Sequence, residues 1–267
     1  MMKDITLGQY FPGDTVIHRL DPRTKILVMI AYIAITFCVR NFWGYIVLAA
    51  FIVISITLSE IPPVFVIKGL KPIMVFIVIT GLFNLFLTGG EVVWQAGVFK
   101  ITKEGIRFAA FMVLRLTFLI LGTSLLTLTT TPISLTDGMY RLLKPFSKIG
   151  LPAHELSMMM SIALRFIPTL MEETDKIMKA QAARGADFEN GSLVQRAKAM
   201  IPILVPLFIS AFRRADELAT AMECRCYSGG NGRTSLHELK LERRDALAGA
   251  CVALMLAAVI FLNITVK

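Results

Sequence analysis

The chain has 267 residues, of which 55% are hydrophobic and 18% are charged, and its mean hydropathy is +0.68. So apolar a composition excludes an ordinary soluble domain, and so many charges exclude a simple bundle of membrane spans unless they are segregated along the chain. The net charge of +9 is typical of a membrane protein that retains Lys and Arg on its cytoplasmic side, so we expect a lipid bilayer as partner and no nucleic acid.

Five apolar segments predict membrane-spanning helices, although several are shorter than the roughly 20 residues that cross the hydrocarbon core. They cover residues 26–39, 43–58, 72–87, 108–130 and 246–264, and a glycine-bearing loop joins the third to the fourth. Lys and Arg gather before the first span, after the second and between the last two. By the positive-inside rule, the N-terminus and residues 133–245 are therefore predicted to be cytoplasmic.

Residues 133–245 contain two stretches that are apolar enough to be mistaken for further membrane-spanning helices. The first, 156–170, contains Arg165, and an arginine at the middle of a bilayer costs about 2.5–3.5 kcal/mol. The second, 199–212, holds Pro202 and Pro206 and is too short. We predict instead three amphipathic helices at the membrane boundary, a short one and two of about 45 Å each, over residues 135–148, 153–184 and 193–225.

The sequence thus predicts an all-α polytopic membrane protein with long amphipathic cytoplasmic helices. We divide it into an N-terminal bundle of four spans, a cytoplasmic region and a C-terminal span, over residues 1–132, 133–245 and 246–267.

Residues 171–188 are similar to residues 213–230, and the matching residues of the two segments are 41 positions apart. Asp175 corresponds to Asp216, and each copy is a helix-forming run that ends in a triplet with a central arginine. Gly185 can take the left-handed conformation that ends a helix, and Arg184 beside it faces the negative pole of the helix dipole. The two triplets are Ala183-Arg184-Gly185 and Cys224-Arg225-Cys226.

An Arg–Gly helix end is by itself an ordinary structural feature. Its repetition at two predicted helix ends favours a functional interpretation. The small neighbours leave each guanidinium accessible, so that a carboxylate of a partner could bind it bidentately. Two similar arginine-bearing ends indicate two similar binding sites.

Other sequence features favour structural roles. The only candidate for a phosphate-binding loop, residues 229–234, lacks the lysine of that motif and is interpreted as a turn. Arg115 in the fourth predicted span either reaches outward or pairs inside the bundle, and we favour a structural role. Asp21 with Pro22 predicts a turn and a helix start. The cysteines and histidines are not spaced for a metal site or a disulfide framework: Cys38, Cys224, Cys226, Cys251, His18, His154 and His237.

Three segments resemble the transmembrane T component of energy-coupling factor transporters, the family that includes the CbiQ-type cobalt transporter subunits. They are PGDTVIHRLDPRTK (12–25), LRFIPTLMEETDKIMKAQAARGADF (164–188) and AMECRCYS (221–228). The family has two Ala-Arg-Gly motifs at the ends of cytoplasmic coupling helices. The first is intact in this chain, whereas the second keeps only Arg225, which puts the geometry of that helix end in question.

The resemblance implies a non-catalytic subunit in a bacterial or archaeal cell membrane. It implies no cofactor on this chain, since ATP and magnesium would bind two partner ATPases of the ABC type. Arg184 and Arg225 would each enter an acidic groove of one ATPase. ATP-driven movement of the coupling helices would then reorient a membrane-embedded substrate-binding S component for vitamin or trace-metal uptake. Its docking surface would be apolar: Met158, Met159, Met160, Ile162, Ile201, Leu204, Leu207 and Phe208.

Two other classes of function remain open from the residues alone. A membrane enzyme could use Arg165, Arg184 and Arg225 to bind a phosphorylated substrate, but no acid–base constellation accompanies them. A channel or secondary transporter would need a polar pathway through the spans. Asn84 in the third predicted span is only weak evidence for such a pathway. Co-purification of two ATPases and a small apolar protein would distinguish the coupling subunit from both.

Overall fold

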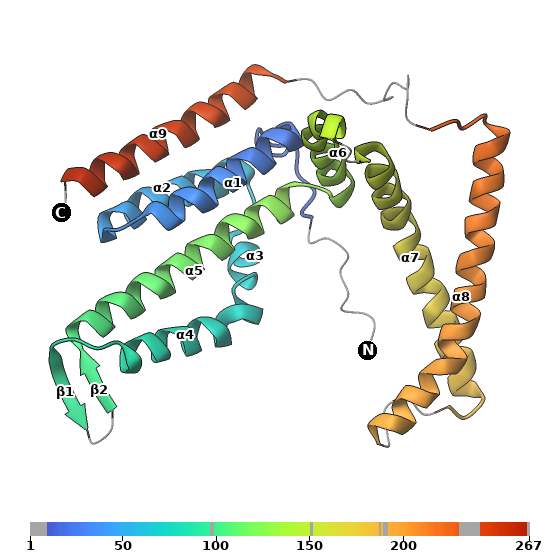
Figure 1. Ribbon diagram of the computed structural model, residues 1–267, viewed down its shortest axis with the longest axis horizontal. Helices are drawn as coiled ribbons and strands as arrows, with labels where there is room; N and C mark the ends of the chain where they lie inside the picture. The colour runs from blue at the N-terminus through green and yellow to red at the C-terminus, as the bar shows by residue number, and fades with distance from the viewer. Residues whose placement is uncertain are drawn as a thin grey trace. The chain divides into compact units, whose positions relative to one another are not determined.

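The structure is a computed structural model that describes residues 10–96, 99–149, 152–186, 188, 192–229 and 241–265 (Figure 1). Its helices fall into two compact units. We call the first the membrane unit, which holds α1 to α6 with a β-hairpin and α9, and the second the α7–α8 pair. The predicted all-α polytopic architecture is confirmed.

The membrane unit contains helices that are long and apolar enough to cross a bilayer. In the described part of the chain, four segments meet that criterion: Phe42–Ser59, Pro63–Leu87, Lys103–Thr129 and Arg243–Thr265. The elements are α1 (Pro22–Cys38), α2 (Phe42–Ser59), α3 (Pro63–Lys68), η1 (Lys71–Ile73), α4 (Met74–Leu87), β1 (Val92–Ala96), β2 (Phe99–Thr102), α5 (Lys103–Thr129), α6 (Pro132–Leu143) and α9 (Arg243–Thr265). The first predicted span corresponds to α1, which at 17 residues is short for a crossing.

Two predicted boundaries differ from the structure. The third apolar segment begins at Pro63 rather than at residue 72, because only residues 69–73, which include the 3₁₀ turn η1, separate α3 from α4. The loop expected before the fourth span contains a hairpin, in which β1 pairs antiparallel with β2 and Ala96 lies opposite Phe99. Residues such as Val92 and Val93 favour a strand through their β-branched side chains.

The core of the membrane unit is built where α1, α2, α5 and α9 meet. Tyr32, Leu48 and Val259 are almost completely buried there. The Tyr32 hydroxyl donates to the Phe118 carbonyl at 2.9 Å, which satisfies a polar group that would otherwise be stranded in an apolar interior. Gly122 on α5 has no side chain where the Tyr32 ring lies, and a Cβ there would clash with that ring.

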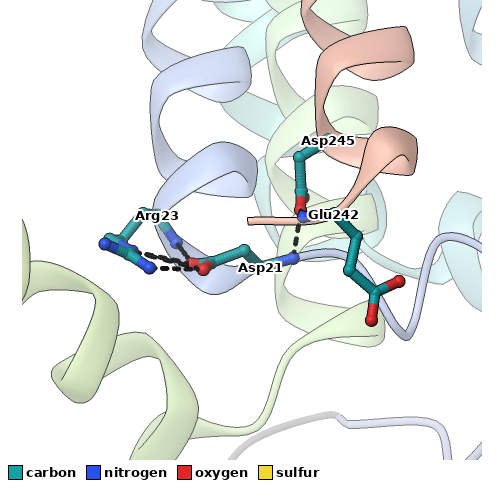
Figure 2. Close-up of polar contacts among 4 residues, drawn as sticks. All are labelled: Asp21, Arg23, Glu242 and Asp245. Carbon is teal, nitrogen blue, oxygen red and sulfur yellow. Dashed lines mark hydrogen bonds and ion pairs between the residues drawn. The ribbon is translucent and has the colours of Figure 1, made fainter. Parts of the chain in front are cut away.

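Two aspartates join the first turns of α1 and α9, which are far apart in the sequence. Asp21 caps α1 by accepting from the Arg23 backbone N–H at 2.8 Å, as the predicted helix start requires. Asp245 accepts from the Asp21 backbone N–H at 2.9 Å and from the Glu242 backbone N–H at 2.8 Å (Figure 2). Both carboxylates are buried, so this contact fixes the start of α9 against the start of α1.

The second unit consists of two long helices, α7 (Ala153–Ala183) and α8 (Leu193–Cys224), preceded by the 3₁₀ helix η2 (Lys144–Ile149). Both long helices begin and end within one residue of their predicted bounds. Ser192 and Gln195 form a capping box that starts α8. Neither helix stops at its internal prolines, Pro168 in α7 and Pro202 and Pro206 in α8. The short helix predicted over 135–148 is divided into α6 and η2.

Candidate functional site

The two arginine-bearing helix ends have the same backbone hydrogen bonds. At the end of α7, Ala186 N–H donates to the Gln181 carbonyl at 3.0 Å, and Gly185 N–H donates to the Ala182 carbonyl at 3.0 Å. This pair of bonds defines a Schellman motif, which satisfies carbonyl groups that have no partner inside the helix. The sequence prediction of a glycine-ended helix is therefore confirmed at α7.

The end of α8 repeats the motif 41 residues later. Tyr227 N–H donates to the Met222 carbonyl at 3.0 Å, and Cys226 N–H donates to the Glu223 carbonyl at 2.8 Å. Cys226 has a φ of 55°, in the left-handed region where Gly185 has a φ of 87°. A side chain in that region costs about 1–2 kcal/mol. The second triplet thus keeps the helix-end geometry despite its departure from Ala-Arg-Gly.

Arg184 and Arg225 occupy equivalent C-cap positions, with φ of −88° and −93° respectively. Both are exposed, and neither forms an ion pair with another described residue. Cys224 and Cys226 on either side of Arg225 are exposed free thiols, and Ala183 beside Arg184 is exposed as well. Each guanidinium is therefore sterically accessible and available for a carboxylate on another protein.

The two helices pack against each other through a polar contact that lies about two thirds of the way along each of them. Glu173 on α7 accepts from the Ser210 hydroxyl at 2.5 Å and from Arg214 Nη2 at 3.0 Å. These hydrogen bonds lower the pKa of Glu173, the one from Ser210 most. Glu173 and Arg214 are separated by 41 residues, the same offset as Arg184 and Arg225. The contact therefore lies at equivalent positions of the repeat, about 16 Å of helix before each arginine end.

A largely apolar groove of about 530 Å³ lies between α7 and α8 on one side of this contact. Phe166 and Leu170 line it from α7, and Leu218 and Met222 line it from α8. Arg214 also lines the groove, and its Nε is buried without a hydrogen-bond partner among the described residues. The groove ends beside Tyr227, next to the second Schellman motif.

The residues predicted as an apolar docking surface are mostly exposed. Among them, Met159, Met160, Ile201, Leu204 and Phe208 are exposed, whereas Met158, Ile162 and Leu207 are half-buried. Ile162 faces the groove between the two helices. The exposed apolar surface of α8 also includes Met200, Val205, Ile209 and Phe212. Among these, the spacing of Met200, Leu204, Phe208 and Phe212 places them on one side of α8.

The side chains of Arg115 and Asn84 each donate a hydrogen bond to a backbone carbonyl. Arg115 Nη2 donates to the Val39 carbonyl at 3.2 Å, and its guanidinium lies 5.6 Å from the centre of the Phe37 ring. A cation at this place stabilises the negative end of α1, in line with the structural role expected. The Asn84 amide donates to the Thr80 carbonyl at 2.8 Å within α4.

The two histidines in the described part of the chain belong to different units, His18 to the membrane unit and His154 to the α7–α8 pair. His18 Nε2 lies 3.1 Å from the Phe11 carbonyl and its Nδ1 lies 2.8 Å from the Thr15 hydroxyl, an arrangement that holds a turn. His154 lies in the first turn of α7. His237 and most of the predicted turn at 229–234 lie outside the described residues. Among the described residues, no group of three or more His, Cys, Asp or Glu is placed to hold a metal ion.

The sequence is similar to a known family over most of its length. The family model described as cobalt transport protein, CbiQ, matches residues 13–236, which include both arginine ends. The chain is 60% identical to an energy-coupling factor transporter transmembrane protein, EcfT, of Clostridium kluyveri, over 98% of each protein. It is 57% identical to the protein of that name from Thermosediminibacter oceani, over 95% of this chain and 96% of the relative. The identity to the one from Bacillus subtilis is 48%, over 98% and 100% respectively.

Proposed function

We propose, since this chain belongs to the CbiQ family and is the transmembrane component of an energy-coupling factor transporter, that each of its two arginine-bearing helix ends binds one of two partner ATPases. The chain itself is a membrane-embedded transporter subunit and not an enzyme. One observation carries the proposal. Two Schellman motifs, 41 residues apart, present Arg184 and Arg225 on the same backbone geometry, exposed and without a described ion-pair partner.

In this proposal, ATP and magnesium bind the ATPases, which are of the ABC type. Each guanidinium enters an acidic groove of one ATPase, where a carboxylate accepts two parallel hydrogen bonds. The N-terminus and the α7–α8 pair are cytoplasmic, which the distribution of Lys and Arg supports. Closure of the ATPase pair moves the two helix ends, and the contact of Glu173 with Ser210 and Arg214 carries this movement from one helix to the other.

The apolar surface of α7 and α8 is proposed to bind the S component. Leu204, Phe208 and Phe212 expose about half to two thirds of their surface, at 49%, 62% and 67%. An apolar patch of this extent on a charged amphipathic helix marks a binding surface for protein or membrane. Methionines at 158–160 add adaptable contacts for more than one partner. The cargo, a vitamin or a trace metal ion, would be set by the S component.

The test reverses the charge at Arg184 and at Arg225. Arg184→Glu and Arg225→Glu are made singly and together, and the tagged chain is purified from its native membrane. Each single change is expected to weaken the capture of ATPase subunits, and the double change to abolish both their capture and ATP-dependent uptake.

Arg213→Glu is the matched control, because Arg213 is also an exposed arginine on α8 but lies outside both triplets. It is expected to leave the complex intact. A double variant that inserts into the membrane and still assembles and transports like the unchanged chain would refute the proposal. Uptake by this chain reconstituted alone would instead support a channel or secondary transporter.

A further inference from the structure

The membrane unit contains a second groove, of about 570 Å³, between α1, α2, α5 and α9. Its lining is almost wholly apolar and includes Val28, Phe51, Leu125 and Leu254. A ligand for this groove must therefore have a hydrocarbon body, since a polar group would lose its hydrogen bonds to water there. All the lining residues belong to the membrane unit.

The size of the groove distinguishes between two kinds of apolar occupant. A volume of 570 Å³ lies within the range of about 300–1,000 Å³ that is usual for small-molecule sites. A transmembrane helix is about 10 Å across and about 30 Å long, so that it would fill several times this volume. The groove therefore fits flexible hydrocarbon chains better than a helix of another protein.

One end of the groove is cationic. Arg244 lines the groove in the first turn of α9. Leu58 in the last turn of α2 and Thr129 at the end of α5 also line it. The Arg244 side chain is 43% exposed and forms an ion pair with the exposed Glu242 carboxylate, in which Nε lies 3.7 Å from Oε2, too far for a hydrogen bond. Arg243 beside it is exposed and forms no ion pair with another described residue.

The buried carboxylates at this end are already engaged (Figure 2). Asp245 accepts from the backbone N–H groups of Asp21 and Glu242, and Asp21 accepts from Arg23, with Nη2 at 2.8 Å. These two acids are therefore committed to the contact between α1 and α9. The guanidinium of Arg244 retains donors for an anion from outside the chain.

We propose that this groove binds an anionic phospholipid, with an acyl chain in the apolar part and the phosphate at Arg244, where the neighbouring Arg243 adds positive charge. A bilayer supplies such a molecule at high local concentration, and basic residues at the ends of transmembrane helices attract anionic headgroups. A phosphate accepts bidentate hydrogen bonds from a guanidinium. The proposal does not depend on the partners proposed for Arg184 and Arg225.

Cys251 offers a direct probe, because it lines the groove and has an exposed thiol. In a full-length chain with Cys38, Cys224 and Cys226 replaced by serine, the rate of maleimide labelling reports access to the groove. The protein is assayed in detergent with added phosphatidylglycerol or phosphatidylcholine. Phosphatidylglycerol is expected to slow labelling about fivefold more than phosphatidylcholine does.

Arg243→Glu with Arg244→Glu is expected to remove the preference for phosphatidylglycerol, and Arg213→Glu to retain it. A second pair of variants tests the apolar part without altering charge. Ala248→Trp fills the groove and is expected to abolish protection by lipid, whereas Ala257→Trp, exposed further along α9, is expected to preserve it.

Equal protection by both lipids would overturn the proposal, because it would show only ordinary solvation by lipid. Protection that requires a co-purified membrane protein and no anionic lipid would also overturn it, in favour of a protein partner in the groove.

Discussion

Apolar side chains are distributed differently in the membrane unit and in the α7–α8 pair. In the membrane unit, Tyr32, Leu48 and Val259 are buried at the junction of four helices. Among the described residues of α7 and α8, Ile203 is the hydrophobic residue that is buried, whereas Phe208 and Phe212 are exposed. The membrane unit therefore buries its apolar side chains in a core, whereas the α7–α8 pair leaves many of them exposed, as a binding surface requires.

The largest effect is expected from Gly122→Leu in the membrane unit. A side chain at this position meets the Tyr32 ring, and overpacking of a core costs up to about 3 kcal/mol. We expect the Tm in detergent to fall by roughly 6–12 °C. Gly249→Leu is the matched control, since nothing lies near the Cβ position of Gly249, and it is expected to leave the Tm almost unchanged. Equal losses in both variants would contradict the assigned packing.

A smaller loss is expected from Asp245→Ala, which removes the acceptor for the backbone N–H groups of Asp21 and Glu242. Buried donors without an acceptor cost about 2 kcal/mol, or roughly 4–8 °C in Tm. Glu242→Ala removes a nearby carboxylate but keeps its own backbone donor, so that it is expected to have little effect. If both variants unfold alike, the contact between α1 and α9 does not contribute as described.

The two helix ends of the α7–α8 pair are expected to respond in opposite directions to small changes. Gly185→Ala places a Cβ at a φ of 87°, and Cys226→Gly removes one at a φ of 55°. Each change is worth about 1 kcal/mol, destabilising in the first case and stabilising in the second. Helix content and proteolysis at each end measure the effect, with Cys224→Ala as a neutral control. Weaker ATPase capture by Cys226→Gly would show that the thiol itself takes part in binding.

The smallest change in stability is expected from Phe208→Gln, although it tests binding most directly. Phe208 is exposed, and exposed substitutions usually change stability by less than about 0.5 kcal/mol. We expect an unchanged Tm together with weaker recovery of the S component. Phe261→Gln, at an exposed position on α9, serves as the control. Equal recovery with Phe208→Gln and with the unchanged chain would argue against α8 as the docking surface.

The bounds of α7 and α8 could be predicted from the sequence because local signals mark them. Ser192 starts α8, and Gly185 ends α7 through its backbone freedom. The Schellman motif at Cys226 could not be predicted with the same ease, since a cysteine rarely adopts a positive φ. The hairpin of β1 and β2 was missed because the glycines before it indicated a loop.

Contacts between distant segments were beyond the reach of local patterns. Asp245 and Asp21 are separated by 224 residues, and neither helix start on its own indicates the other. Arg115 was recognised as unusual in a span, but its acceptor, the Val39 carbonyl, lies 76 residues away. Glu173 and Arg214 are separated by 41 residues, as Arg184 and Arg225 are. The repeat in the sequence could therefore have indicated that Glu173 and Arg214 occupy equivalent positions.

That shared offset has a mechanical consequence. If the contact between Glu173 and Arg214 acts as a pivot, the two lever arms that reach Arg184 and Arg225 have equal lengths. A rotation of α7 and α8 about this contact would therefore move Arg184 and Arg225 by equal distances.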